Sequence, residues 1–178
     1  MKLNKKKVSF LISGKGSNLL KILINNFNSK NFNTVSIISN NLISDEIKDF
    51  VKDHNLKINI LEKVTNIKSL YLKDSDVIFS VGYMKVISSK LINKFNIINL
   101  HPSLLPKYKG LMAQKRMLIN NEKEFGFTIH KVSAELDAGN IISQKRKQIS
   151  NFNEQEILRA HKELEHKFVY KELVDYLN

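Results

Sequence analysis

Short apolar runs alternate with stretches of helical periodicity over the first half of this 178-residue chain. After the second run, Ile47, Phe50 and Val51 recur at the spacing of one helix face and predict a helix over about residues 44–54. Strands that alternate with helices predict an α/β fold with a parallel sheet, whose ligands bind at the carboxyl ends of the strands. The strand-like runs are residues 8–13, 34–39, 57–61, 76–80 and the segment that begins at Asn96.

Two further strands are predicted in the second half. Residues 127–132 alternate between apolar and polar side chains and residues 140–149 form another run, so residues 133–139 connect them. Gly126 is expected just before the first of these strands. In the first half, the polar stretch 62–75 is short for a crossover helix and predicts a clipped helix or a loop.

The last segment predicts a helix that runs nearly to the end of the chain. Asn153 with Glu156 three residues later has the pattern of a capping box at its start. Glu165 lies beside the inward face, and a charge at such a position is ordinarily half of a surface ion pair. The side chains expected on the inward face are Ile157, His161, Leu164 and Phe168.

Composition indicates one globular domain over residues 1–178. The chain is 42% apolar and 26% charged, which is ordinary for a folded domain of this size. The absence of cysteine excludes disulfides, thiolate catalysis and cysteine zinc sites. No apolar run approaches the length of a membrane span, and no cleavable apolar segment follows Lys5, Lys6 and Lys7. We therefore expect a cytoplasmic protein that does not bind membranes.

The net charge of +12 raises the possibility of nucleic-acid binding. The lysines are scattered, however, and only Arg116, Arg146 and Arg159 of the 29 basic residues are arginine. This bias predicts a solvated basic surface instead of the clustered face that phosphate backbones require. We therefore expect no nucleic-acid partner, although a basic surface would attract anionic small molecules. A nucleic-acid-binding module is the alternative from a different functional class.

The segment from Asn99 to Gly110 is the strongest chemical signal. It follows an apolar run and contains Pro102 and Pro106, which restrict the backbone and predict a loop of one defined shape. Asn99 and His101 occupy alternate positions of a strand end, so their side chains point the same way. An amide donor and an imidazole facing one cleft suit acid–base chemistry, although an isolated pair of this kind is more often structural.

A glycine loop follows the first strand. Gly14, Lys15, Gly16, Ser17 and Asn18 precede a helix-like run, so the sequence predicts a strand, a tight turn and a helix start. The N–H groups of such a helix start favour an anion, and Ser17 or Asn18 is expected to cap it. A tight turn without any ligand is the alternative. The ending of a Walker loop is absent.

Four motifs resemble the folate-dependent formyltransferases. The string Asn-Leu-His-Pro-Ser-Leu-Leu-Pro-Lys-Tyr-Lys-Gly is similar to the signature of that family. Ser-Gly-Lys-Gly-Ser-Asn-Leu resembles the loop with which the phosphoribosylglycinamide formyltransferases hold a ribose phosphate, and Glu-Leu-Asp-Ala-Gly-Asn-Ile-Ile resembles the family's aspartate loop. Glu165 with His166 resembles a pair on the last helix. The resemblance spans Val8 to about Phe168 and implies a single-domain, Rossmann-like formyltransferase fold with a mostly parallel sheet flanked by helices.

The resemblance implies a role for each motif. Asn99 would donate to the formyl oxygen, His101 would carry the proton, and Asp137 would orient His101, although a loop aspartate is more often a turn former. Glu165 would bind the substrate amine, and His130 is expected to be a structural histidine near the site. The phosphate loop is Gly14, Lys15, Gly16, Ser17 and Asn18. The implied folate contacts are Met84, Lys85, Val86 and Ile87, whose segment has a helix-packing alternative, together with Ser133, Ala134, Glu135 and Asp137.

The implied reaction transfers a formyl group from 10-formyltetrahydrofolate to the amine of glycinamide ribonucleotide, without a metal. The N-terminal half would bind the phosphorylated substrate, and the C-terminal half would bind folate and carry catalysis. The protein would be a monomer or a homodimer. Other formyltransferases, acting on a sugar nucleotide or on methionyl-tRNA, and a formyltetrahydrofolate hydrolase are the alternatives.

Overall fold

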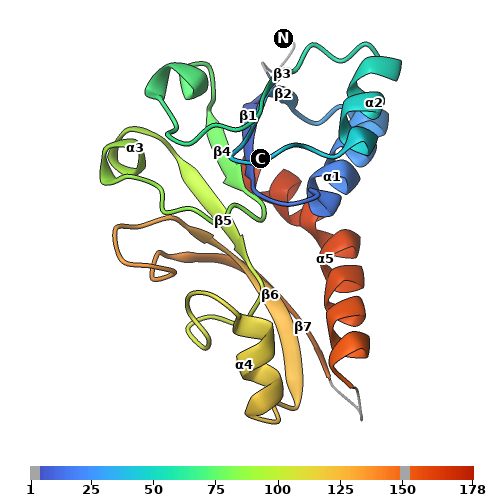
Figure 1. Cartoon of the computed structure of the whole chain (residues 1–178), viewed down its shortest axis with the longest axis vertical. Helices are drawn as coiled ribbons and strands as arrows, with labels where there is room; N and C mark the ends of the chain where they lie inside the picture. Colours follow the sequence, from blue (N-terminus) through green and yellow to red (C-terminus); the bar gives the residue numbers. More distant parts are fainter. Residues whose placement is uncertain (1–4, 149–152) are drawn as a thin grey trace.

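The computed structural model describes residues 5–148 and 153–178, and within them seven strands form one sheet (Figure 1). Its order is β3-β2-β1-β4-β5-β6-β7. The strands are β1 (Lys7–Ile12), β2 (Asn33–Ser39), β3 (Asn59–Leu61), β4 (Val77–Ser80), β5 (Ile97–His101), β6 (Glu124–Lys131) and β7 (Ile141–Gln148). The helices are α1 (Ser17–Ser29), α2 (Asp45–Asp53), α3 (Ser89–Lys94), α4 (Ala113–Ile119) and α5 (Glu154–Leu177), with a 3₁₀ turn, η1 (Ser69–Leu72).

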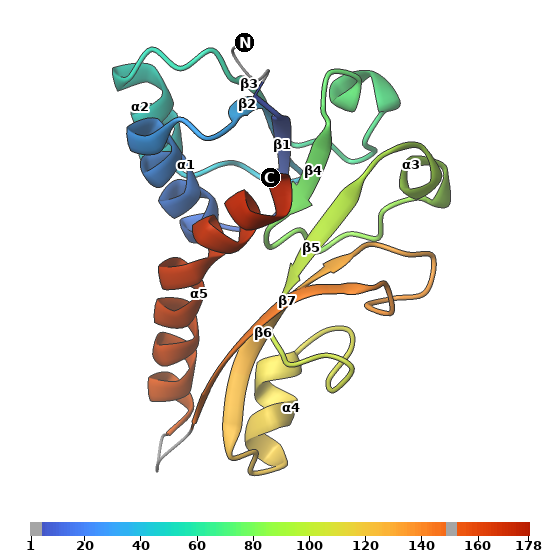
Figure 2. The same ribbon diagram turned by 180° about the vertical axis from the view of Figure 1, so that it is seen from behind.

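The sheet is parallel from β3 to β5 and antiparallel from β5 to β7. β6 and β7 form a long hairpin that extends beyond the parallel part, beside α4 (Figures 1 and 2). The loop between them, residues 132–140, is too short for a crossover connection, so β7 returns antiparallel to β6. The prediction of a mostly parallel sheet flanked by helices is confirmed.

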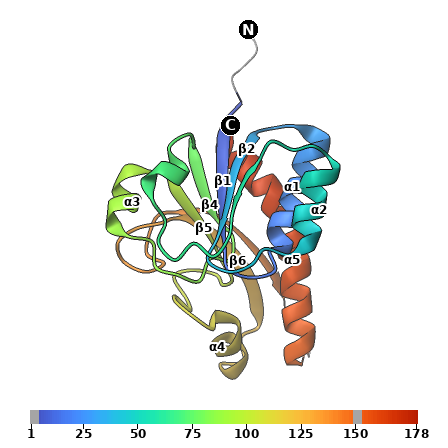
Figure 3. The same cartoon turned by 45° about the horizontal axis from the view of Figure 1, so that its top comes forward.

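Helices cover both faces of the parallel part, as the tilted view shows (Figure 3). Phe10 and Ile12 of β1 belong to the apolar cluster that packs against α1, α2 and α5. The intervening Leu11 belongs to the opposite cluster, with Leu72 of η1 and Leu91 of α3. Both faces of β1 are therefore buried, which is why its sequence is a continuous apolar run.

The predicted elements occur close to their expected places, with a few differences. The stretch 62–75 is a loop with the short turn η1, as predicted, but the helices α3 and α4 were not predicted. Gly126 lies inside β6 instead of before it, and glycine is needed there because a Cβ would lie 2.0 Å from the carbonyl oxygen of Lys145 on β7. The predicted end of the last strand, at Ile149, lies outside the described residues.

The final helix begins as predicted. The side chain of Asn153 accepts a hydrogen bond from the Glu156 N–H, and the Glu156 carboxylate accepts one from the Asn153 N–H. Ile157, His161 and Leu164 are buried against the sheet. In residues 5–148 and 153–178, no helix combines the length and the apolar character that a membrane crossing requires.

Candidate active site

The loop after β5 is held in one shape by side chains from the β6–β7 hairpin. Thr128 Oγ1 donates to the carbonyl oxygen of Ser103 at 2.7 Å and accepts from the Leu105 N–H at 3.0 Å. Gln144 Nε2 donates to the carbonyl oxygen of Leu105 at 2.8 Å. The two prolines thus predicted a defined loop correctly, but the residues that secure it, Thr128 and Gln144, carried no recognisable signal in the sequence.

His101 ends β5 and is buried. Its Nε2 lies 2.9 Å from the carbonyl oxygen of Tyr108, so we assign the ring hydrogen to Nε2. Its Nδ1 then carries the lone pair and lies 3.2 Å from Oδ2 of Asp137. Burial lowers the pKa of His101 below its ordinary value, and the opposing effects of the Tyr108 carbonyl and Asp137 do not fully compensate. The imidazole is therefore a neutral base with its lone pair directed at a carboxylate.

Asp137 closes the loop between β6 and β7. Its backbone adopts a left-handed conformation with φ of 49°, and Oδ2 accepts a hydrogen bond of 2.8 Å from the Gly110 N–H. Burial raises the pKa of this carboxyl, but contact with His130, the Gly110 N–H and His101 outweigh burial, so the pKa lies below its ordinary value. Asp137 is thus an ionised group held by the central loop.

Asn99 lies in one row with Ser80 of β4 and His130 of β6, because these residues are paired across the sheet. Ser80 Oγ donates to Asn99 Oδ1 at 2.7 Å, and Asn99 Nδ2 lies 3.2 Å from His130 Nε2. His130 Nδ1 lies 2.8 Å from the Lys131 carbonyl oxygen, so we assign a ring hydrogen to Nδ1, and Asn99 Nδ2 has at most one hydrogen directed at this ring. One hydrogen of the Asn99 amide then remains for a ligand.

The motifs predict a structural role for His130 and carry no signal for Ser80. His130 Nε2 also lies 3.5 Å from Oδ1 of Asp137, so the ring lies between Asn99 and that carboxylate. The structure therefore brings Asn99, His101 and Asp137 together, as the motifs predicted. The sheet register supplies two additional polar partners that only pairing between strands could reveal.

The glycine loop after β1 forms the predicted tight turn. Gly16 has φ of 73°, and a Cβ there would lie 2.7 Å from Cδ1 of Ile47, so glycine is favoured at this position. The expected side-chain cap is wrong, because Gly16 itself is the N-cap of α1 and no side chain caps the helix. Ser17 is the first helical residue. The first N–H groups of α1 therefore face outward without intrahelical partners and can bind an anion.

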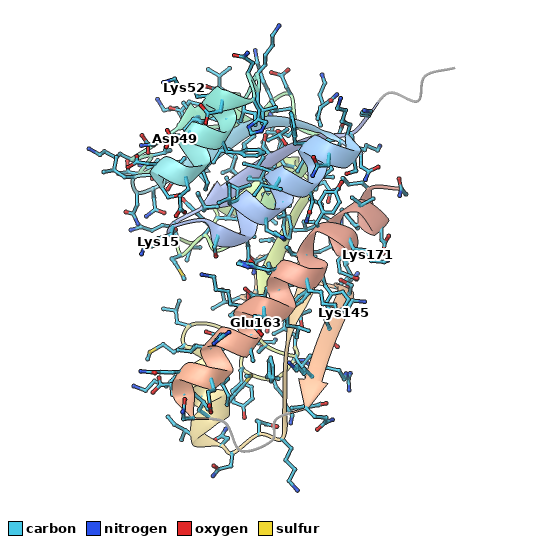
Figure 4. The ribbon with its side chains drawn as sticks, turned by 90° about the vertical axis from the view of Figure 1, so that its right-hand side faces the viewer. Lys15, Asp49, Lys52, Lys145, Glu163 and Lys171 are labelled. Carbon is cyan, nitrogen blue, oxygen red and sulfur yellow. The ribbon has the colours of Figure 1, made fainter. Side chains whose placement is uncertain are left out.

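Ser13 joins this glycine loop to the loop that follows β4. Its hydroxyl accepts from the Met84 N–H at 2.7 Å, and its own N–H donates to the Gly82 carbonyl oxygen at 3.0 Å. Gly14 and Lys15 are exposed at the surface, and Lys15 lies beside the start of α1 in Figure 4. The glycine loop and the loop that follows β4 are thus neighbours at the carboxyl ends of the strands, where Asn99 also lies.

The segment predicted to contact folate is irregular, and its helix-packing alternative holds for Ile87 alone of the four residues. Met84, Lys85 and Val86 are exposed, and Ile87 packs against the cluster that contains α3. Across the site, Leu136 approaches Gly110, within 3.5 Å of where a Cβ would lie. Exposed large apolar side chains therefore gather on three neighbouring loops, namely Met84 (69%), Val86 (91%), Leu111 (72%), Met112 (63%) and Leu136 (62%).

The remaining predicted folate contacts lie on the Asp137 loop. Ser133 is half-buried and its hydroxyl donates to the Glu135 carbonyl oxygen at 2.8 Å. Ala134 is exposed, and the Glu135 carboxylate forms an exposed ion pair of 3.0 Å with Lys109. In the part of the chain that the structure describes, no group of three or more histidine or carboxylate side chains is arranged to hold a metal ion.

Glu165 does not form the surface ion pair that its sequence position suggested. It is only 9% exposed. Oε2 accepts a hydrogen bond of 2.7 Å from Asn18 Nδ2, and Oε1 lies 3.2 Å from Nδ1 of His161. Asn18, expected to cap α1, thus connects the anion loop to the last helix. Glu165 lies beside the glycine loop.

This chain is similar to known proteins over most of its length. The Formyl transferase family model matches residues 6–173. A "Trifunctional purine biosynthetic protein adenosine-3" from Chironomus tentans is 34% identical over 79% of the chain, and a methionyl-tRNA formyltransferase from Fusobacterium nucleatum is 36% identical over 59% of it. The chain spans only 11% and 36% of these two curated relatives.

A solved structure matches over most of both chains. Phosphoribosylglycinamide formyltransferase from Anaplasma phagocytophilum superposes with a TM-score of 0.84 at 29% identity. The match covers 97% of this chain and 87% of that one. Since the family model covers almost the whole chain, this protein belongs to the formyl transferase family.

Proposed function

We propose that this protein transfers a formyl group from 10-formyltetrahydrofolate to the amine of glycinamide ribonucleotide. The observation that carries the proposal is the His101–Asp137 contact of 3.2 Å, next to an Asn99 amide with one hydrogen left for a ligand. An acid–base group and an oxyanion donor on one strand end are what direct acyl transfer to an amine requires. The name of the Anaplasma relative supports the choice of acceptor.

Each residue of the site has a separate role in the proposed reaction. Asn99 donates its remaining amide hydrogen to the formyl oxygen, where negative charge develops as the amine attacks. His101 accepts the proton of the attacking amine at Nδ1, since Nε2 is held by the Tyr108 carbonyl. Asp137 stabilises the charge that His101 then carries, and His101 returns the proton to the departing nitrogen. Ser80 and His130 hold the Asn99 amide in the orientation that this requires.

The formyl donor fits the apolar side of the site. It supplies a formyl group attached to a nitrogen that can leave, and the same molecule carries a pterin ring system. Exposed Met84, Val86 and Leu136 on neighbouring loops offer the apolar contact that such a ring needs, and backbone groups of Lys85 and Ile87 offer hydrogen bonds. We assign folate binding to these loops and to Ser133, Ala134 and Glu135.

The acceptor fits the side of the site formed by the glycine loop and α5. The exposed N–H groups at the start of α1, with Gly14, Lys15, Gly16 and Ser17, suit a phosphate. Glu165 and Asn18 lie next to this loop and suit the polar end of a small phosphorylated amine. Substrate binding then belongs to the first loop of the N-terminal half and α5, and folate binding and catalysis to the C-terminal half together with the loop after β4.

The test is to incubate the purified protein with 10-formyltetrahydrofolate and one acceptor at a time, and to follow the release of tetrahydrofolate. We expect turnover with glycinamide ribonucleotide and none with an amino-sugar nucleotide or methionyl-tRNA. Turnover with one of the latter alone would replace the acceptor but keep the chemistry. Release of tetrahydrofolate without any acceptor would instead indicate a hydrolase.

A further inference from the structure

Backbone groups of residues 108–110, in the loop after β5, hold both His101 and Asp137. The carbonyl oxygen of Tyr108 lies 2.9 Å from His101 Nε2. Two residues later, the Gly110 N–H donates to Asp137 Oδ2 at 2.8 Å. The same oxygen of Asp137 lies 3.2 Å from His101 Nδ1, so the contact between the two side chains depends on this short segment.

Arg116 of α4 binds the middle of this segment. Its Nη2 donates a hydrogen bond to the carbonyl oxygen of Lys109, and its Cζ lies 5.6 Å from the centre of the Tyr108 ring. A planar guanidinium can stack on a ring while its N–H groups donate. Nε of Arg116 is buried, with no hydrogen-bond partner among the described residues, so the guanidinium lies against the loop instead of extending into water.

The Lys109 carbonyl and the Gly110 N–H belong to one peptide unit. This unit is planar and trans, so its oxygen and its hydrogen point in opposite directions. Arg116 binds the oxygen and Asp137 binds the hydrogen, and both hydrogen bonds involve a charged side chain. Each bond polarises the peptide in the direction that strengthens the other. The guanidinium and the carboxylate therefore fix the orientation of this peptide together.

The backbone of the segment needs such support. Tyr108 has φ of 59° and Gly110 has φ of 81°, and the left-handed conformation is unfavourable for tyrosine. The Tyr108 hydroxyl donates to Glu122 Oε1 at 2.7 Å and accepts from Asn120 Nδ2 at 2.9 Å. With Arg116, these residues place the side chains that hold the segment on α4 and on the turn that follows it.

The charge of Arg116 also acts on His101. Burial is the main reason that the pKa of His101 lies below its ordinary value, and the charges of His130 and Arg116 lower it further. The Tyr108 carbonyl and Asp137 oppose these effects. The charged and titratable groups that face the imidazole thus come from α4, from β6 and from the loop between β6 and β7. Removal of the guanidinium should raise this pKa.

We propose that Arg116 is a positioning residue, which fixes the peptide between Lys109 and Gly110 and so holds Asp137 beside His101. It acts through the loop and not on the substrate. The reaction that this arrangement serves rests on the proposed function, whereas the effect of Arg116 on the peptide does not.

Kinetics test the role in catalysis. Arg116→Gln removes the charge and the planar fork. We expect kcat to fall about tenfold or more, because a hydrogen bond from a charged group is lost, while the KM values for glycinamide ribonucleotide and 10-formyltetrahydrofolate stay within about twofold. The acidic limb of kcat/KM should move to higher pH, since the pKa of His101 rises. Arg116→Lys keeps the charge but not the fork, so kcat should recover only in part and the limb should match that of the unaltered protein.

Lys115→Gln is the matched control, because it removes one positive charge from an exposed position of the same helix. It should alter neither kcat nor the acidic limb. An unchanged kcat in a folded Arg116→Gln protein, or an equal shift of the limb in Lys115→Gln, would overturn the proposal. If Arg116→Gln does not fold, Arg116→Lys decides: a lowered kcat with an unaltered limb supports the proposal, and the kcat of the unaltered protein overturns it.

The peptide itself can be observed without turnover. The chain has six glycines, so ¹⁵N-labelled glycine gives a simple amide spectrum, in which the loss of a signal in Gly110→Ala assigns Gly110. In Arg116→Gln we expect the Gly110 amide proton to move upfield and to exchange with solvent about tenfold faster, because its hydrogen bond loses a cooperative partner.

Lys115→Gln should leave the Gly110 signal in place. A Gly110 signal that is also unaltered in Arg116→Gln would overturn the proposal, whatever reaction the protein catalyses. Absence of turnover with glycinamide ribonucleotide in the unaltered protein would count against the proposed function alone, and the amide spectrum would then decide the role of Arg116.

Discussion

The two ring nitrogens of His101 have opposite partners: Nε2 faces the Tyr108 carbonyl at 2.9 Å and Nδ1 faces the Asp137 carboxylate at 3.2 Å. The first contact fixes the ring hydrogen on Nε2, so Nδ1 is the only ring position that can take up a proton. The second contact places the Asp137 carboxylate beside that position. Substitution of His101 and substitution of Asp137 should therefore affect different steps of the reaction.

His101→Ala should lower kcat by about a hundred- to ten-thousandfold, the usual contribution of a positioned acid–base group. The KM for the acceptor should change little, because the phosphate loop is untouched. Single-turnover release of tetrahydrofolate measures the effect, and circular dichroism checks folding. His54→Ala, at an exposed histidine, serves as the control. Retained kcat in a folded His101→Ala protein would remove His101 from the mechanism.

The pH dependence should follow His101. Burial holds the pKa of its imidazole below the ordinary 6.5, so the acidic limb of kcat/KM should fall below pH 6.5. Asp137 opposes this effect, so Asp137→Asn should move that limb to still lower pH, while kcat falls because the charged imidazole loses its partner. The full pH profiles of both proteins measure the shift. A limb that moves to higher pH in Asp137→Asn would contradict the assignment.

Ser80→Ala should reduce kcat without altering either KM. The hydroxyl donates to Asn99 Oδ1 at 2.7 Å and orients the amide that is proposed to stabilise the developing negative charge. Loss of one such hydrogen bond should cost about 1 kcal/mol, or roughly five- to tenfold in rate. Ser75→Ala is the control, since it removes a serine hydrogen bond, to Ser9, before the other end of β4. Equal losses in both variants would indicate a general effect on the sheet.

Ser17→Asp should raise the KM for the phosphorylated acceptor. The new carboxylate would lie at the first residue of α1, where it would compete with the phosphate for the exposed N–H groups. A negative charge at the N-terminus of a helix interacts favourably with the helix dipole, so the free energy of unfolding should not fall. Asn28→Asp makes the same charge change at the exposed far end of the helix and should leave the KM unaltered. Parallel rises in the acceptor and folate KM values would indicate that the loop is only a structural turn.

Gly16→Ala should destabilise the fold by about 1–3 kcal/mol, since φ is 73° and the Cβ would meet Ile47 Cδ1 at 2.7 Å. Gly14→Ala is the matched control, because a Cβ there meets nothing within 4 Å. Urea unfolding of both variants compares their free energies. A stable Gly16→Ala protein would show that α1 can shift away from α2.

Much of the architecture could be predicted because it depends on local patterns. The strand runs, the face of α2 and the capping box at Asn153 are set by periodicity and by neighbouring residues. The short helices α3 and α4 were missed, since their few residues show no clear period and their ends are decided by packing. The inner position of Gly126 was missed because the approach of the Lys145 carbonyl comes from another strand.

The sequence by itself determined the order of the strands and of the helices α1, α2 and α5, the defined loop after β5 and the chemical groups Asn99, His101 and Asp137. The tertiary structure alone decided which partners these groups have. Ser80 and His130 flank Asn99 because of the strand register, and Glu165 joins His161 to Asn18 although 147 residues separate it from Asn18. Side-chain partners across strands and helices depend on how the whole chain packs, whereas periodicity and turn chemistry act between residues close in sequence.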